Sequence, residues 1–142
     1  MTADMERFVE AQTWVIMFGP SMSGLRWWHL VLPRQFRHVS LARDINGKCL
    51  SVNPLAHVMA IKEYDETLLE FVQRQAPYST AILQYTVFYG AHYRPACIEP
   101  LTCVSMAKRL LGIRKRLVTP KGLYRELLRA GALTLKPWTP HA

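Results

Sequence analysis

The chain has 142 residues, of which 50% are hydrophobic, and its formal net charge is +8 at pH 7. A chain of this length and apolar content hides about two-thirds of its unfolded surface on folding, so general disorder is excluded and one domain over residues 1–142 is expected. The longest uncharged window, residues 75–93, contains proline and several polar residues, which argues against a membrane span.

The cysteines and the start of the chain indicate a soluble protein made in a reducing cytoplasm. The three cysteines form an odd set without a C-x-x-C motif, and Cys97 and Cys103 lack the paired spacing of a zinc site. The first residues contain no basic segment followed by an apolar run, so no secretory leader is predicted. We expect no disulfide framework, no metal and no cofactor.

The first half of the chain is typical of strands. Residues 14–18 form an apolar strand that ends at Gly19-Pro20, and residues 21–30 form either a short helix or a loop. Strands at 36–43 and 48–53 flank Asn46-Gly47, the strongest short signal for a two-residue type I′ turn. A third strand is expected at 56–62. The sequence therefore predicts a β-hairpin followed by a further strand.

The turn sets the register of this hairpin. If Asn46 and Gly47 are the two loop residues, Ile45 faces Lys48, and His38 and Asn53 become diagonal neighbours on one face of the sheet. Their backbones are then about 7–8 Å apart, which two side chains can span. A loop one residue longer moves Asn53 to the opposite face.

The second half alternates helices with one strand. A helix starts at Asp65 or Thr67 and ends before Pro77, a strand covers 79–90, and a helix opens at Thr119-Pro120 and closes at Gly131. The residues expected to face the core are Leu68, Leu69, Phe71 and Val72 in the first helix and Leu123, Tyr124, Leu127 and Leu128 in the second. Residues 137–142 are expected to be an irregular tail. The predicted class is α+β, with an antiparallel sheet packed on helices.

Cys103 is the most reactive position that the sequence predicts. Residues 103–112 have the spacing of a helix with one buried face, with Thr102 as the N-cap and Gly112 at the C′ position. Unpaired N–H groups and the helix dipole at such a start stabilise a thiolate, so we expect a lowered pKa for this thiol. The alternative is that Cys103 is a small buried hydrophobe.

His38 and Asn53 supply the partners that such a thiol needs. An asparagine oxygen that accepts from one imidazole nitrogen leaves the other nitrogen facing the thiol, as in a Cys-His-Asn site. Taken separately, His38 is equally explained as a half-buried strand histidine, and Asn53 before Pro54 as a turn residue that ends a strand.

The order of these pieces resembles small bacteriophage and prophage proteins of the permuted papain-like class. The resemblance covers residues 27–130 and lies in Phe36-Arg-His38, in Thr102-Cys103-Val and in the helices that follow. The histidine precedes the cysteine, as in circularly permuted NlpC-type and lecithin:retinol acyltransferase-like enzymes. The resemblance implies Cys103 as nucleophile, His38 as base and Asn53 as orienting residue, although the third position varies in these folds. It also implies a cysteine peptidase or amidase, with a peptidoglycan peptide as the natural amide for a phage protein.

Two other functions fit the same sequence. A structural virion protein of the tail or adaptor region keeps the fold without turnover and binds other virion proteins. A module that binds anionic polymers, such as those of cell walls, uses the basic residues after Cys103, which include Arg114, Lys115 and Arg116. Without interleaved exposed aromatic residues, this cluster is weak evidence for nucleic-acid binding. The expected location is cytoplasmic at synthesis and then virion-associated.

Overall fold

The computed structural model describes residues 10–20, 35–54, 59–89, 103–117 and 119–139. The predicted strands and helices that fall in these ranges are all present, and one further strand appears near the C-terminus. The elements are β1 (Glu10–Gly19), β2 (His38–Ile45), β3 (Lys48–Pro54), β4 (Met59–Tyr64), α2 (Leu68–Gln75), the 3-10 helix η2 (Ala76–Tyr78), β5 (Ala81–Tyr89), α3 (Cys103–Leu111), α4 (Pro120–Arg129) and β6 (Leu133–Lys136).

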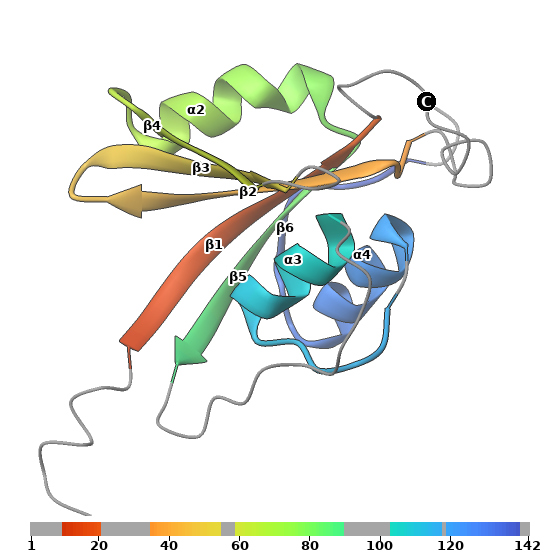
Figure 1. Cartoon of the computed structure of the whole chain (residues 1–142). Helices are drawn as coiled ribbons and strands as arrows, with labels where there is room; N and C mark the ends of the chain where they lie inside the picture. The colour runs from red at the N-terminus through yellow and green to blue at the C-terminus, as the bar shows by residue number, and fades with distance from the viewer. Residues whose placement is uncertain (1–9, 21–34, 55–58, 90–102, 118, 140–142) are drawn as a thin grey trace, which may run out of the picture.

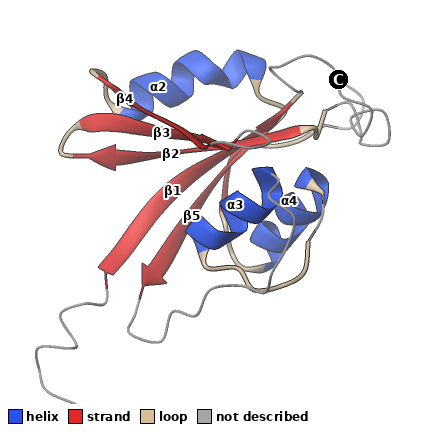
Figure 2. Cartoon of the chain, viewed as in Figure 1, coloured by secondary structure: helices blue, strands red, loops and turns tan. Residues whose placement is uncertain are grey.

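The strands form one antiparallel sheet in the order β4-β3-β2-β1-β5-β6. Helix α2 lies on one face of this sheet, and α3 and α4 lie on the other (Figures 1 and 2). The predicted α+β class with an antiparallel sheet is therefore confirmed.

The β2–β3 hairpin has the predicted turn and register. Asn46 and Gly47 both have positive φ angles, 52° and 84°, as a type I′ turn requires. Ile45 pairs with Lys48, and the ladder continues with the same register to Leu41 and Val52. Asn53 therefore lies on the face that the sequence predicted for it.

Alternation along β2 gives the two faces of the sheet different cores. Val39 and Leu41 are fully buried in the larger cluster, which includes residues of α3 and α4. Ala42 belongs to a smaller cluster with Met17 of β1 and Phe71 of α2. Because successive side chains of a strand point to opposite faces, His38 lies on the same side of β2 as Ala42.

Helices α2 and α4 begin where the sequence predicted. Their N-caps are Thr67, one of the two predicted starts, and Thr119.

Two of the leucines expected in the core are instead exposed. Leu69 of α2 is 66% exposed. It is two residues from the buried Phe71, a rotation of about 200° around the helix axis. Leu128 of α4 is 39% exposed and lies at the rim of the buried face.

β6 was not predicted from the sequence. One of its residues, Lys136, is hydrogen-bonded to the segment that follows α2. The Nζ of Lys136 donates hydrogen bonds to the carbonyl oxygens of Ala76 and Ser79, both at 2.6 Å. Residues 137–139 have no helix or strand, as expected for the tail, and residues 140–142 lie outside the described ranges. Within 137–139, Trp138 packs against Phe36 and Tyr124 in the larger core.

Candidate functional site

The site is built around a break in the ladder between β2 and β3. The hydrogen-bonded register ends at Leu41 and Val52. Two residues further along, the same register brings Val39 opposite Pro54. Proline has no N–H, so this pair cannot form the usual two hydrogen bonds. The two strands therefore leave unpaired backbone at the start of β2.

The other neighbour of β2 shows which way the Val39 backbone points. Phe18 of β1 is paired with Val39, but the Phe18 carbonyl accepts a hydrogen bond from Thr80 on the β5 side, at 2.7 Å. Phe18 and Val39 are thus a pair without mutual hydrogen bonds, and the polar groups of Val39 face β3. Both the N–H and the C=O group of Val39 therefore point into the break, and the N–H is the group that can donate there.

Cys103, the first residue of α3, supplies the group that meets this donor. Its thiol accepts a hydrogen bond from the backbone of Val39, the residue that follows His38. The backbones of Cys103 and Val104, at the start of α3, contribute further hydrogen bonds to the sulfur. The residue is partly buried and packs against the larger core cluster.

The pKa of the Cys103 thiol corrects one sequence prediction. Burial raises this pKa above its ordinary value, because desolvation disfavours the thiolate. The backbone hydrogen bonds of Val39, Val104 and Cys103 act in the opposite direction, but they do not outweigh burial. The prediction of a lowered pKa was therefore wrong. The thiol is protonated at neutral pH, and its use as a nucleophile requires a base.

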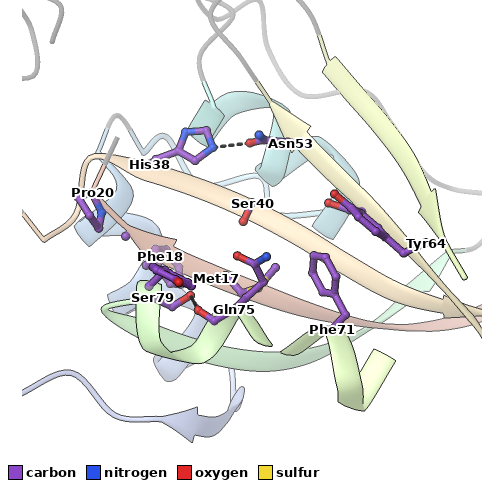
Figure 3. A pocket seen from close by; sticks show the side chains of 13 residues that line it. Met17, Phe18, Pro20, His38, Ser40, Asn53, Tyr64, Phe71, Gln75 and Ser79 are labelled. Carbon is purple, nitrogen blue, oxygen red and sulfur yellow. Dashed lines mark hydrogen bonds between the residues drawn. The ribbon is translucent and has the colours of Figure 1, made fainter. Parts of the chain in front are cut away.

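His38 and Asn53 form the predicted diagonal contact between β2 and β3. The Nε2 atom of His38 is hydrogen-bonded to the Oδ1 atom of Asn53 (Figure 3). A carbonyl oxygen only accepts, so Nε2 carries the proton in the neutral imidazole, and Nδ1 then holds the lone pair. This is the tautomer in which an asparagine orients a histidine base.

The structure brings two of the three predicted residues together and places the third, Cys103, on the opposite face of the sheet. His38 and Asn53 contact each other directly. Cys103 contacts the backbone of the residue next to His38 from the side of α3. The assignment of the three as a catalytic set stays a prediction.

A pocket lies on the α2 side of the sheet, next to the His38–Asn53 pair. It has a volume of about 140 Å³. Its lining includes His38, Asn53 and three polar residues that sequence analysis missed, Ser40, Ser51 and Gln75 (Figure 3). The two serines could have been found from the sequence. Side chains two residues apart on a strand lie on the same face, and Ser40 and Ser51 are two residues from His38 and Asn53. Gln75 comes from α2, and nothing in the strand pattern indicated it.

Cys49 and Cys103 are both free thiols but lie in different environments. Cys49 is fully buried, and burial raises its pKa to about 11, with a further contribution from Glu66. It belongs to the α2-side core. Cys97, the proposed N-cap Thr102 and the other histidines, His29, His57, His92 and His141, lie outside the described residues.

The basic residues after Cys103 lie in different environments. Lys108 is fully buried, Lys115 contacts Glu126 at 3.2 Å, and Arg114 and Arg116 are exposed.

The described helices are all too short or too polar to cross a membrane.

Comparisons with known proteins add no relative. The chain matches no family model, and no curated protein or solved structure is significantly similar to it.

Proposed function

We propose that the protein is a cysteine hydrolase of amide or ester bonds, with Cys103 as nucleophile, His38 as base and Asn53 as the residue that orients the imidazole. The observation that carries the proposal is the His38–Asn53 hydrogen bond beside the break in the β2–β3 ladder where the Cys103 thiol contacts the Val39 backbone.

The chemistry follows from the protonation states. In the proposed mechanism the His38 side chain, which lies on the α2 side of the sheet, turns past the start of β2 toward α3, and Nδ1 takes the thiol proton of Cys103 as the sulfur bonds to the carbonyl carbon of the substrate. The imidazolium then returns the proton to the leaving nitrogen or oxygen, and the bond to that atom breaks. Water attacks the resulting thioester, His38 takes its proton, and the thiol leaves with that proton. Backbone N–H groups at the start of α3 stabilise the oxyanion.

The finer assignment is that the fold is of the permuted papain-like class and that the protein acts in a bacteriophage. Two features of the described fold support it: the cysteine opens a helix that packs on the sheet, and the histidine lies earlier in the chain on a strand. The proposed substrate is the peptide part of peptidoglycan, and the proposed setting is the virion after cytoplasmic synthesis.

The test of the Cys-His pair is alkylation of Cys103 by iodoacetamide at pH 7, followed by mass spectrometry of the modified peptide. The His38→Ala variant is expected to label about 100-fold more slowly, because the raised pKa leaves little thiolate without the base. Its residual rate should increase as the pH rises toward the thiol pKa.

Two further variants give this experiment its controls. Asp44→Asn on the same strand should label at the wild-type rate, since Asp44 is exposed. The labelling rate of Asn53→Ala should lie between the rates of the wild type and of His38→Ala. Equal labelling rates for the wild type and His38→Ala would show that His38 does not activate the thiol.

A second candidate function, a structural virion or assembly protein, is favoured by an exposed apolar part of the sheet. Phe88 of β5 is 71% exposed, and Leu133 and Leu135 of β6 are 62% and 47% exposed. Leu133 pairs with Gln84, so Leu133 and Phe88 lie on the α2 side of the sheet, whereas a β-bulge interrupts the alternation before Leu135. An uncovered apolar face of this kind is typical of a contact between subunits.

This alternative predicts self-association through that face. Light scattering after gel filtration at high micromolar concentration should give a mass above that of the monomer, and Leu133→Lys should restore the monomer. Leu69→Lys, an equally exposed leucine on α2, is the control and should leave the mass unchanged. A wild-type protein that stays monomeric at every concentration would contradict the assembly function for this face.

A further inference from the structure

Part of the sheet face on the α2 side is polar, although the rest of that face carries the smaller apolar core. Four polar residues alternate along the adjacent strands β2 and β3 on this side: His38, Ser40, Ser51 and Asn53. On the opposite side of the same strands, Val39, Leu41 and Val52 are buried and apolar. Polar groups on a helix-covered sheet face lose free energy of hydration, so their presence here indicates a function other than packing.

The walls of the pocket above these residues are held in place by hydrogen bonds. The hydroxyl of Ser79 donates to the carbonyl oxygen of Gln75 at 3.0 Å, which fixes the end of α2. Lys136 of β6 holds the following segment through the carbonyl oxygens of Ala76 and Ser79. These hydrogen bonds connect the end of α2, the segment that follows it and β6 at one side of the pocket.

The chemistry of the lining defines the occupant. Serine hydroxyls and the carboxamide of Gln75 both donate and accept hydrogen bonds. Among the described residues that line the pocket, none is Asp, Glu, Lys or Arg. A volume of about 140 Å³ holds roughly five groups of the size of water. The matching ligand is neutral, has both a donor and an acceptor, and contains about five non-hydrogen atoms.

We propose that this pocket binds an uncharged carboxamide group of the substrate, on the α2 side of the sheet and away from the Cys103 thiol. The proposal rests on the proposed hydrolase function, because His38 and Asn53 belong both to that site and to the lining of the pocket. A carboxylate or an ammonium group in the same position lacks an opposite charge and loses its hydration, so the pocket selects against charged groups. The site thereby favours substrates that carry a neutral amide group in addition to the bond that is cleaved.

The test uses propionamide and propionate, two small molecules of equal size that differ in charge at pH 7. Each is titrated into the Cys103→Ser protein, and binding is followed by NMR through backbone and side-chain amide signals. Propionamide is expected to shift the signals of Ser40, Ser51, Asn53 and Gln75 in a saturable way with a millimolar dissociation constant, which five heavy atoms can supply. Propionate is expected to bind at least about 10-fold more weakly.

A matched pair of variants locates the binding. Ser51→Val removes one hydroxyl from the pocket floor and should weaken propionamide binding roughly fivefold. Thr13→Val removes a hydroxyl from β1 that bonds Thr86 at 2.9 Å outside the pocket lining, and it should leave binding unchanged. Shifts that do not saturate, equal affinity for propionate, or equal effects of the two variants would overturn the proposal.

The binding and the hydrolysis can fail separately in these experiments. NMR measures the pocket in a protein without the nucleophile, whereas alkylation measures the activation of Cys103. Propionamide binding together with normal labelling of His38→Ala would overturn the hydrolase and leave a carboxamide-binding pocket. Normal activation of Cys103 without propionamide binding would overturn the pocket and leave the hydrolase.

Discussion

Replacement of Cys103 by alanine is expected to abolish the release of soluble peptide from purified peptidoglycan. In the proposed mechanism the thiol forms the covalent intermediate, and loss of such a nucleophile typically costs at least about 1000-fold in rate. The measurement compares new amino groups and soluble fragments released by the wild type and by Cys103→Ala at equal concentrations of folded protein.

Cys49→Ala provides the matched control for this experiment. It removes the other described free thiol, which is fully buried and has a pKa of about 11, so it should keep the wild-type rate per folded molecule. Equal release by the wild type and Cys103→Ala would reject Cys103 as the nucleophile. A wild type that labels normally but releases nothing would reject peptidoglycan as the substrate and retain the activated thiol.

The local parts of the fold could be predicted because short-range chemistry determines them. Asn46-Gly47 fixes the hairpin through two residues with positive φ, and Thr67 and Thr119 cap their helices through their own hydroxyls. From the hairpin register alone, the contact between His38 and Asn53 follows. Two-residue periodicity is sufficient to predict a contact across a tight turn.

The predictions that failed depend on contacts distant in sequence. β6 has only four residues and is stabilised by pairing with β5 and by the bonds of Lys136 to the segment after α2, which local pattern cannot show. The raised pKa of Cys103 has the same origin. The dipole at a helix start is a local property, but the desolvation that outweighs it comes from the sheet packed against that helix.

The corrected pKa changes how the proposed site works. A thiol with a lowered pKa forms a stable ion pair with histidine, whereas a thiol with a raised pKa transfers its proton only as the bond to carbon forms. The orientation of His38 by Asn53 is then more important, because the imidazole must accept the proton at a fixed position. This is why Asn53→Ala is expected to affect thiol labelling even though Asn53 does not touch the sulfur in the proposed mechanism.

Replacement of Phe36 by alanine is expected to lower the free energy of unfolding by about 3–5 kcal/mol. The Phe36 side chain is fully buried, and its ring centroid lies 5.8 Å from that of Phe18, 5.3 Å from that of Tyr124 and 5.1 Å from that of Trp138. Loss of the ring leaves a cavity between the sheet, α4 and the tail. Urea unfolding followed by circular dichroism measures the change.

Phe88→Ala is the matched control, because Phe88 is 71% exposed and its loss should change the free energy of unfolding by less than about 0.5 kcal/mol. A change below about 1 kcal/mol for Phe36→Ala would show that the aromatic cluster is not a stabilising core. Phe36 also precedes His38 by two residues, and its ring anchors the chain where β2 begins. A variant that stays folded should therefore label Cys103 more slowly than the wild type, since the orientation of His38 depends on that anchor.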